Sequence, residues 1–166
     1  MPFGTLVIYT SSQKGSIEFD KQLYEKFGAR VIRDRAKILL PTPRITKRAI
    51  KILKNESITR VWFGAAAPLA LMASALRKNG VSNIVALSHG HEVWWSKVFP
   101  FTLAMRRIGS SVDVLTYLGE FTRTAIAGAL ASKSADAMVK IAPGIDTEHF
   151  VPIDSSSLRQ SLGLSE

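Results

Sequence analysis

The segment Ser-His-Gly-His-Glu at residues 88–92 holds the densest group of chemically active side chains in the sequence. In it His89 and His91 flank Gly90, and Glu92 follows directly. Imidazole and carboxylate groups can ligate a metal ion or contact phosphate and sugar oxygens. Three interpretations are open: a metal site, a contact to a phosphate or sugar, and a histidine that satisfies loop carbonyl groups. A metal site needs further ligands, and no second cluster of His and Asp occurs, so we predict no metal.

Sequence signatures of several other enzyme classes are absent. No G-x-G-x-x-G follows the apolar run at 5–9, and no G-x-x-x-x-G-K-[ST] occurs, which argues against a dinucleotide dehydrogenase and a P-loop NTPase. No G-x-S-x-G elbow is present, which argues against a serine hydrolase. The chain has no cysteine, so disulfides and thiol chemistry are excluded, and we predict no cofactor.

The elements that must position these residues alternate between strands and helices. Apolar, β-branched runs predict strands at 5–9, 29–34, 58–63, 84–87, 112–118 and 137–141. Helical spacing predicts helices at 44–56, 68–79, 101–108, 120–130 and 155–164, with an irregular stretch around 20–27. This order predicts an α/β fold, a Rossmann-like and mostly parallel sheet with helices on both faces.

The carboxyl ends of such strands are where functional residues gather. Gly64, the histidine segment and Gly119 each follow an expected strand. The small residues Gly-Ala-Ala-Ala at 64–67 either let a helix N-terminus approach a phosphate or merely allow close packing of helix on sheet.

The expected helix at 44–56 is basic along one stripe. Ile45, Ala49, Ile52 and Leu53 share the apolar side. The opposite side carries Arg44, Lys47, Arg48, Lys51 and Lys54 with no acid to pair at i+4. The ordinary interpretation is a solvated basic face; the alternative is reversible docking on an anionic membrane, where each cation contributes about 1 kcal/mol.

The charge of the whole chain points to an anionic partner. Lysine and arginine number 22 against 13 acidic residues, giving a net charge of +9. Nucleic acid, sugar phosphates and anionic lipid all fit this balance, and composition does not choose among them. No apolar run reaches the roughly 20 residues of a membrane span.

Four segments, in order and at suitable spacing, resemble the N-terminal domain of the family-4 glycosyltransferases of the GT-B fold. They are Val-Trp-Phe-Gly-Ala-Ala-Ala-Pro-Leu-Ala at 61–70, the histidine segment, Asp-Val-Leu-Thr at 113–116, and Ala-Pro-Gly-Ile-Asp-Thr-Glu-His-Phe at 142–150. The last contains G-[VI]-D-x-x-x-F, a strong mark of the family. The resemblance covers nearly all of residues 3–164 and is greatest to the actinobacterial mannosyltransferases of phosphatidylinositol mannoside synthesis.

The resemblance implies a retaining hexosyltransferase with two facing Rossmann-like domains. The N-terminal domain would hold a lipid-linked acceptor such as a phosphatidylinositol mannoside, and the C-terminal one a nucleotide sugar, in this subgroup GDP-mannose. His89 matches the catalytic histidine that approaches the donor's sugar and phosphate. The cleft would also include Gly64, Gly90, His91, Glu92 and Gly119. The helix at 44–56 would border the acceptor side and bind anionic lipid, on the cytoplasmic face of the plasma membrane.

Two departures from the family qualify this expectation. The family's domain opens with a strand and a Gly-Gly loop that touches the donor diphosphate, and the resemblance places the run at 5–9 at the family's second strand. We expect residues 1–152 to form the N-terminal domain and 153–166 to begin the linker toward a separate C-terminal domain. The chain alone is then expected to be inactive. The alternative function is a non-catalytic basic α/β module that binds anionic lipid or, less favoured, nucleic acid.

Overall fold

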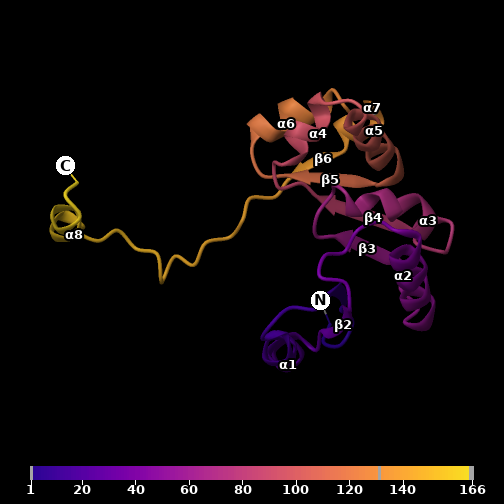
Figure 1. The fold of residues 1–166 in the computed structure, drawn as a ribbon, viewed down its shortest axis with the longest axis horizontal. Helices are drawn as coiled ribbons and strands as arrows, with labels where there is room; N and C mark the ends of the chain where they lie inside the picture. The colour runs from indigo at the N-terminus through magenta and orange to yellow at the C-terminus, as the bar shows by residue number, and fades with distance from the viewer. Residues whose placement is uncertain (1, 131, 165–166) are drawn as a thin grey trace.

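The computed structural model describes residues 2–130 and 132–164, in which strands and helices alternate (Figure 1). The elements in chain order are β1 (Val7–Ser11), α1 (Ser16–Phe27), β2 (Arg30–Asp34), α2 (Pro43–Asn55), β3 (Arg60–Phe63), the 3-10 helix η1 (Leu69–Met72), α3 (Ala73–Arg77), β4 (Asn83–Leu87), α4 (Glu92–Lys97), α5 (Phe101–Ser111), β5 (Val114–Tyr117), α6 (Glu120–Ala127), α7 (Ser132–Asp136), β6 (Met138–Lys140) and α8 (Ser156–Ser161).

The described strands form two parallel sheets rather than one. The larger sheet has four strands in the order β3-β4-β5-β6, and β1 pairs with β2 in a separate two-stranded sheet. Every pairing is parallel. The predicted α/β class, with parallel strands and covering helices, is confirmed, and the division of the sheet is a difference from the expectation.

The hydrophobic core lies between the larger sheet and its helices. Ile84 and Ala86 of β4, Leu115 of β5, and Met105 and Ile108 of α5 are almost completely buried. Strands of a parallel sheet are covered on both faces and are therefore apolar throughout. In Figure 1, helices α4 to α7 gather beside β5 and β6, and α2 and α3 lie beside β3 and β4. β4 is an interior strand of this sheet, because it pairs with β3 on one side and with β5 on the other.

Residues 20–27, expected to be irregular, belong to helix α1. Gly15 and Gly28 flank the helix with φ of 76° and 65°, a left-handed conformation that glycine adopts at little cost. No residue of α1 is buried, and Ile17 and Phe19 are exposed. The sequence prediction relied on a core-facing apolar stripe, and this helix has none.

The other expected elements differ from the structure mainly at their ends. The helix expected at 68–79 divides into the 3-10 helix η1 and α3. The helix expected at 44–56 is α2, which begins after the N-cap Thr42, whose hydroxyl accepts from the backbone N–H of Ile45. Pro43 occupies the first helical position, where its missing N–H costs nothing.

The C-terminal segment lies apart from the two sheets. After β6 the chain has no regular structure until α8, and no residue of α8 is buried. Figure 1 shows this segment running away from the body of the molecule. Within the described residues, no helix combines the length and the apolar character needed to cross a membrane.

Candidate functional site

The histidine segment lies at the carboxyl end of β4, an interior strand of the larger sheet. β4 pairs with β3 on one side and with β5 on the other. Ser88 is completely buried directly after the strand, and His89 is exposed. In parallel α/β sheets this end of the strands is where ligands bind. The location is therefore the one that the sequence prediction required for His89.

Both histidine rings contact the segment that follows β3. Nε2 of His89 is 2.6 Å from the carbonyl oxygen of Gly64, and Nε2 of His91 is 2.9 Å from that of Ala67. Carbonyl oxygens only accept hydrogen bonds, so Nε2 carries the proton in each ring. Nδ1 is then the ring nitrogen that remains for another partner. These contacts match the interpretation of histidines that satisfy loop carbonyls, and they bring Gly64 into the same site as His89.

Glu92 holds this loop from inside the protein. Its side chain is fully buried, and Oε2 accepts hydrogen bonds from the Ser88 hydroxyl and from the backbone N–H groups of His89 and Gly90, each at 3.1 Å. Oε1 accepts from the backbone N–H of Ala67 at 3.4 Å. Charge-assisted hydrogen bonds of this kind satisfy a buried carboxylate. Glu92 was predicted to line the cleft; its burial instead gives it an anchoring position.

Gly90 and Gly119 complete the edge of the sheet. Gly90 has φ of 97°, in the left-handed region, so a side chain there would be strained. An added Cβ would lie 3.8 Å from the Thr122 hydroxyl, which shows that the loop passes close to α6. Gly119 is the N-cap residue of α6 and lies two residues after the end of β5. The segments after β3, β4 and β5 thus meet at one edge.

A second polar centre, which the sequence analysis missed, surrounds Asp34 at the end of β2. Asp34 is completely buried and binds Arg44 at 2.8 Å and Arg48 at 3.1 Å. The Tyr9 hydroxyl and the backbone N–H of Ala36 also donate to it, each at 2.8 Å. The hydrogen bonds from Arg44 and Ala36 hold the pKa of Asp34 well below its usual range. Burial, together with the hydrogen bond to Asp34, raises the pKa of Tyr9 to about 12.

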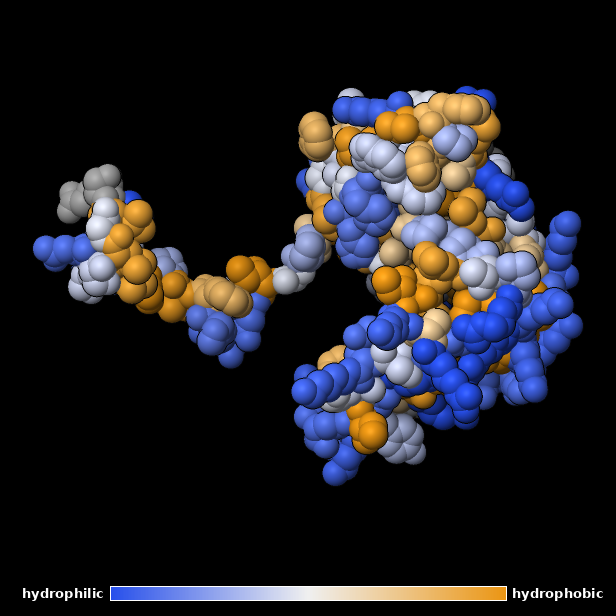
Figure 2. Space-filling model, in the orientation of Figure 1, coloured by the Kyte–Doolittle hydropathy of each residue, from blue (hydrophilic) through white to orange (hydrophobic). Residues whose placement is uncertain are grey.

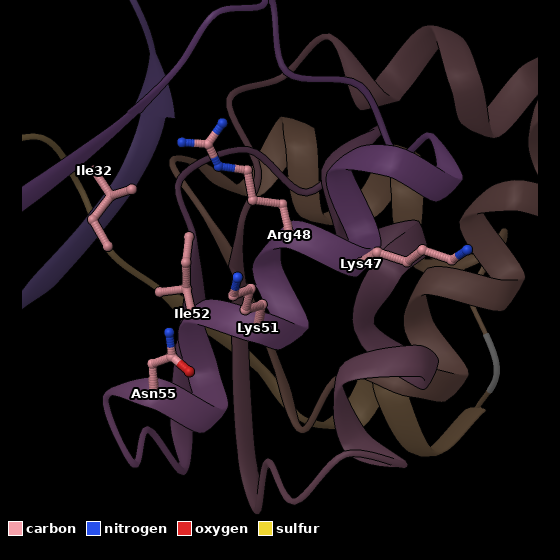
Figure 3. A pocket seen from close by; sticks show the side chains of 6 residues that line it. All are labelled: Ile32, Lys47, Arg48, Lys51, Ile52 and Asn55. Atoms are coloured by element: carbon pink, nitrogen blue, oxygen red, sulfur yellow. The ribbon is translucent and has the colours of Figure 1, made fainter.

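These contacts revise the expected basic stripe of α2. The stripe has no acid at i+4 within the helix, but Arg44 and Arg48 are paired with Asp34 of β2, a partner from another element that the helical spacing did not indicate. The lysines of the stripe, Lys47, Lys51 and Lys54, are exposed. A shallow, open depression of about 510 Å³ lies between β2 and α2 (Figure 3), and its walls are formed by Ile32, Lys47, Arg48, Lys51, Ile52 and Asn55.

The described residues contain no group of three or more His, Cys, Asp or Glu side chains that could hold a metal ion. The site at the end of β4 presents the exposed rings of His89 and His91 beside glycines, while the backbone N–H groups of His89 and Gly90 are already engaged by Glu92. A protonated imidazole can bind the oxygens of a phosphate or a sugar and stabilise negative charge.

Comparison of the sequence with known proteins finds relatives of similar sequence. No protein-family profile matches the sequence. The chain is 37% identical over 163 residues to the GDP-mannose-dependent alpha-(1-6)-phosphatidylinositol monomannoside mannosyltransferase of Mycolicibacterium smegmatis, a match that covers 97% of the chain and 42% of that enzyme. It is 36% identical to the GDP-mannose-dependent monoacylated alpha-(1-6)-phosphatidylinositol monomannoside mannosyltransferase of Corynebacterium glutamicum, covering 98% of the chain and 42% of the enzyme.

The solved structures show a similar fold at lower identity. The crystal structure of Anabaena Alr3699/HepE in complex with UDP matches with a TM-score of 0.58 and 15% identity, over 98% of this chain and 50% of that one. The same protein in complex with UDP and glucose matches with a TM-score of 0.56. The chain is thus a homologue of the GDP-mannose-dependent phosphatidylinositol monomannoside mannosyltransferases, spanning about two-fifths (42%) of their length, and has the α/β fold of half of the HepE chain.

Proposed function

We propose that the chain is the acceptor-side, N-terminal part of a retaining mannosyltransferase, which transfers mannose from GDP-mannose to a phosphatidylinositol mannoside. The observation that carries this proposal is the 37% identity to the Mycolicibacterium enzyme along 97% of the chain. Position supports it as well, because the histidine segment lies at the carboxyl end of an interior strand, where α/β sheets bind ligands.

In this proposal His89 stabilises charge at the donor. Breaking the bond between mannose and diphosphate leaves negative charge on the leaving phosphate, and a hydrogen-bond donor placed there lowers the barrier. Nε2 of His89 is engaged by Gly64, so Nδ1 is the nitrogen that would face the sugar donor, and it can donate a hydrogen bond to the phosphate only in the imidazolium form of the ring, in which both nitrogens carry a proton. Glu92 is a positioning residue, since it binds the Ser88 hydroxyl and the backbone N–H groups of His89 and Gly90. Gly64, Gly90 and Gly119 leave room for the substrates, and His91 fixes the loop through Ala67.

The remaining partners follow from the same proposal. A separate C-terminal domain would supply most contacts to the nucleotide sugar, and the lipid acceptor would bring the protein to the inner face of the plasma membrane as a peripheral protein. The exposed Lys47, Lys51 and Lys54 would contact anionic headgroups. Residues 1–152 would form the acceptor domain and 153–166 the start of the linker.

Complementation tests this proposal. The chain is mixed with the separately produced C-terminal half of the Mycolicibacterium enzyme, radiolabelled GDP-mannose and phosphatidylinositol monomannoside in vesicles. We expect labelled lipid only when both halves are present. His89→Ala should abolish the labelling, and His149→Ala, which removes an exposed histidine of the C-terminal segment, should not. Vesicle binding without any labelling in the mixture would favour the alternative of a non-catalytic lipid-binding module.

A further inference from the structure

The outward side of helices α4 and α5 exposes large apolar side chains. Trp94 of α4 is 54% exposed, Phe99 in the turn between the two helices is 77% exposed, and Leu103 of α5 is 55% exposed. Figure 2 shows hydrophobic side chains among hydrophilic ones over the part of the molecule where Figure 1 places α4 to α7. Single exposed apolar residues are common on protein surfaces, whereas a group of them marks a site of interaction.

The packing of α4 determines which of its side chains point outward. Trp95 packs against the hydrophobic core. The hydroxyl of Ser96 donates to the carbonyl oxygen of Ala125 in α6 at 3.0 Å, so this side of α4 faces α6. Trp94 and Lys97 are three residues apart, which places them on one face of the helix, and both are exposed. They form the outward face of α4.

Helix α5 has an inner and an outer face in the same way. Met105 and Ile108 are completely buried in the core. Leu103, Arg106 and Arg107 are exposed, and their spacing of three and four residues places them on one face. The outer face of α5 therefore combines an apolar side chain with two cations.

The ring of Phe101 joins the two helices. Its centroid lies 4.7 Å from that of Trp94 and 4.8 Å from that of Trp95. Because Trp95 is anchored on the hydrophobic core, these ring contacts hold Trp94 in place as well. The exposed side chains of α4, α5 and the turn between them are therefore presented by one packed pair of helices.

The exposed charges of this helix pair are all basic. From residue 93 to residue 112 the sequence contains Lys97, Arg106 and Arg107 and no acid. All three cations are exposed, and the ion pairs of the described residues involve none of them. The α4–α5 surface thus consists of six exposed residues that are large and apolar or charged: Trp94, Lys97, Phe99, Leu103, Arg106 and Arg107.

An anionic phospholipid bilayer fits this combination of groups. Large apolar side chains enter the layer between water and hydrocarbon, which tryptophan prefers, and neighbouring cations pair with lipid phosphates. The stems of lysine and arginine lie along apolar groups while their charge stays in water. A second copy of the chain would instead bring like charges together, which is unfavourable. Helix α1 also exposes Ile17 and Phe19, but it carries acids as well as bases and so lacks selectivity for an anionic surface.

We propose that the α4–α5 surface inserts into the interfacial layer of an anionic phospholipid bilayer. Its apolar side chains lie among the headgroups and upper acyl chains, and its three cations stay at the level of the phosphates. The surface differs from α2, which exposes lysines but, along Pro43–Asn55, no large apolar side chain. Because α4 begins directly after His91, insertion holds the histidine segment close to the membrane. The proposal does not depend on mannosyl transfer.

Spin labels measure the depth of insertion. The chain has no cysteine, so one introduced cysteine carries a nitroxide label at a chosen position. Phe99→Cys and Leu103→Cys place the label on the α4–α5 surface, and Phe19→Cys places it on an exposed residue of α1. Vesicles of phosphatidylcholine and phosphatidylserine are the probe. On their addition, the first two labels should gain contact with oxygen, which concentrates in hydrocarbon, and lose contact with a water-soluble nickel complex. The label at position 19 should change little.

Paired variants measure what the apolar groups contribute to binding. Trp94→Ser with Phe99→Ser removes two large side chains of the surface and should weaken sedimentation with these vesicles by about tenfold or more. Ile17→Ser with Phe19→Ser removes two exposed side chains of α1 and should weaken it by less than about twofold.

A third variant tests the cations. Changing Lys97, Arg106 and Arg107 to Gln should weaken binding to the vesicles that contain phosphatidylserine and leave binding to phosphatidylcholine alone unchanged. For the unmodified chain, binding should decrease as salt is added but persist at high salt, because salt screens the charges and not the apolar contacts.

Three results would overturn the proposal. They are labels at positions 99 and 103 that stay in contact with the nickel complex in the bound chain, equal vesicle binding by the Trp94→Ser, Phe99→Ser variant and the unmodified chain, and a dimer in sedimentation velocity that this variant abolishes. In the last case the surface joins two copies of the chain.

One further measurement leaves the surface unchanged and so holds even where a variant does not fold. Vesicles with bromine atoms on their acyl chains should quench the tryptophan fluorescence of the unmodified chain. Quenching should persist in Trp62→Phe, since Trp62 lies in β3, away from α4; its loss in that variant would contradict insertion of Trp94. No measurement contains GDP-mannose, so a failure here leaves the proposed transfer reaction untouched, and a failed transfer assay leaves this surface untouched.

Discussion

At the scale of single residues, Glu92 connects the packing of the protein to its candidate chemistry. A fully buried carboxylate is costly unless donors surround it, and here the donors are the backbone and hydroxyl groups on either side of His89. The same bonds that satisfy Glu92 therefore fix the orientation of the loop. His89 and His91 then bind the neighbouring segment through Nε2, so two loops behave as one unit.

Replacing Glu92 with Gln should loosen this unit. The amide keeps the volume but turns an NH2 group toward N–H donors, so at least one buried group loses its partner, at about 1–3 kcal/mol in the free energy of unfolding. Urea denaturation measures the loss, with the exposed Glu148→Gln as the control. Nitrogen-15 spectra of the histidine rings should show that His89 no longer holds a fixed Nε2–H tautomer. Unchanged ring signals would argue against a positioning role even where stability falls.

Asp34 makes stability depend on pH in the acidic range. Its pKa in the folded protein lies below its value in the unfolded chain, near 3.9, because Arg44 and the backbone of Ala36 stabilise the carboxylate. A group with a lowered folded pKa contributes its full stabilisation above the unfolded pKa and loses it as the pH falls toward the folded pKa. The free energy of unfolding should therefore decrease below about pH 4.

Asp34→Asn tests this dependence. The variant should have a lower free energy of unfolding than the unmodified chain at pH 7. This difference in the free energy of unfolding should become smaller as the pH falls from about 4 to 2. Urea denaturation at a series of pH values measures both curves, with the exposed Asp146→Asn as the control. Parallel curves for Asp34→Asn and the unmodified chain would contradict the assignment.

At the scale of elements, the sequence predicted correctly the strands and helices that have a strong local pattern of apolar residues. The apolar run at 84–87 and the helical spacing at 44–56 placed β4 and α2 to within one residue of their observed bounds. Helix α1 has no buried stripe and was missed. The pairing of Asp34 with Arg44 and Arg48 joins residues of different elements, and the burial of Glu92 depends on how two loops close. Contacts of this kind, between side chains that lie far apart in the sequence, leave no periodic signal. The division of the strands into two sheets leaves none either.

Helix α2 carries a prediction about lipid. Because Arg44 and Arg48 are held by Asp34, the cations available to a membrane on this helix are chiefly Lys47, Lys51 and Lys54. Each contributes about 1 kcal/mol near an anionic surface. Changing all three to Gln should therefore weaken sedimentation with phosphatidylserine-containing vesicles by up to about 3 kcal/mol, with the largest effect at low salt.

The control removes the same charge elsewhere. Lys14, Lys37 and Lys78 are exposed and lie outside α2, so their triple change to Gln isolates the effect of net charge. Equal weakening by both triple variants would mean that the +9 charge acts as a whole and that α2 is not the contact surface.

At the scale of the whole molecule, the candidate site is an open edge. His89 is exposed, and the chain corresponds to about half of the HepE chain, at 50% coverage. In water a single hydrogen bond to a phosphate contributes little, because water competes for both partners at high dielectric constant. Electrostatic stabilisation becomes large only where a second surface closes over the substrate and excludes water. The same histidine should therefore act very differently in the open chain and in a closed, complete site.

The isolated chain is accordingly expected to bind GDP only weakly and to transfer no mannose. Titration calorimetry with GDP should give no saturation in the micromolar range, since a dissociation constant of 1 μM requires about 8 kcal/mol and one exposed imidazole supplies a small part of it. A radiolabelled GDP-mannose assay with lipid acceptor should show no product above background. Turnover by the purified chain that disappears in His89→Ala and persists in His149→Ala would refute this expectation. It would mean that self-association closes the site over His89, and sedimentation velocity at the assay concentration would then show a dimer.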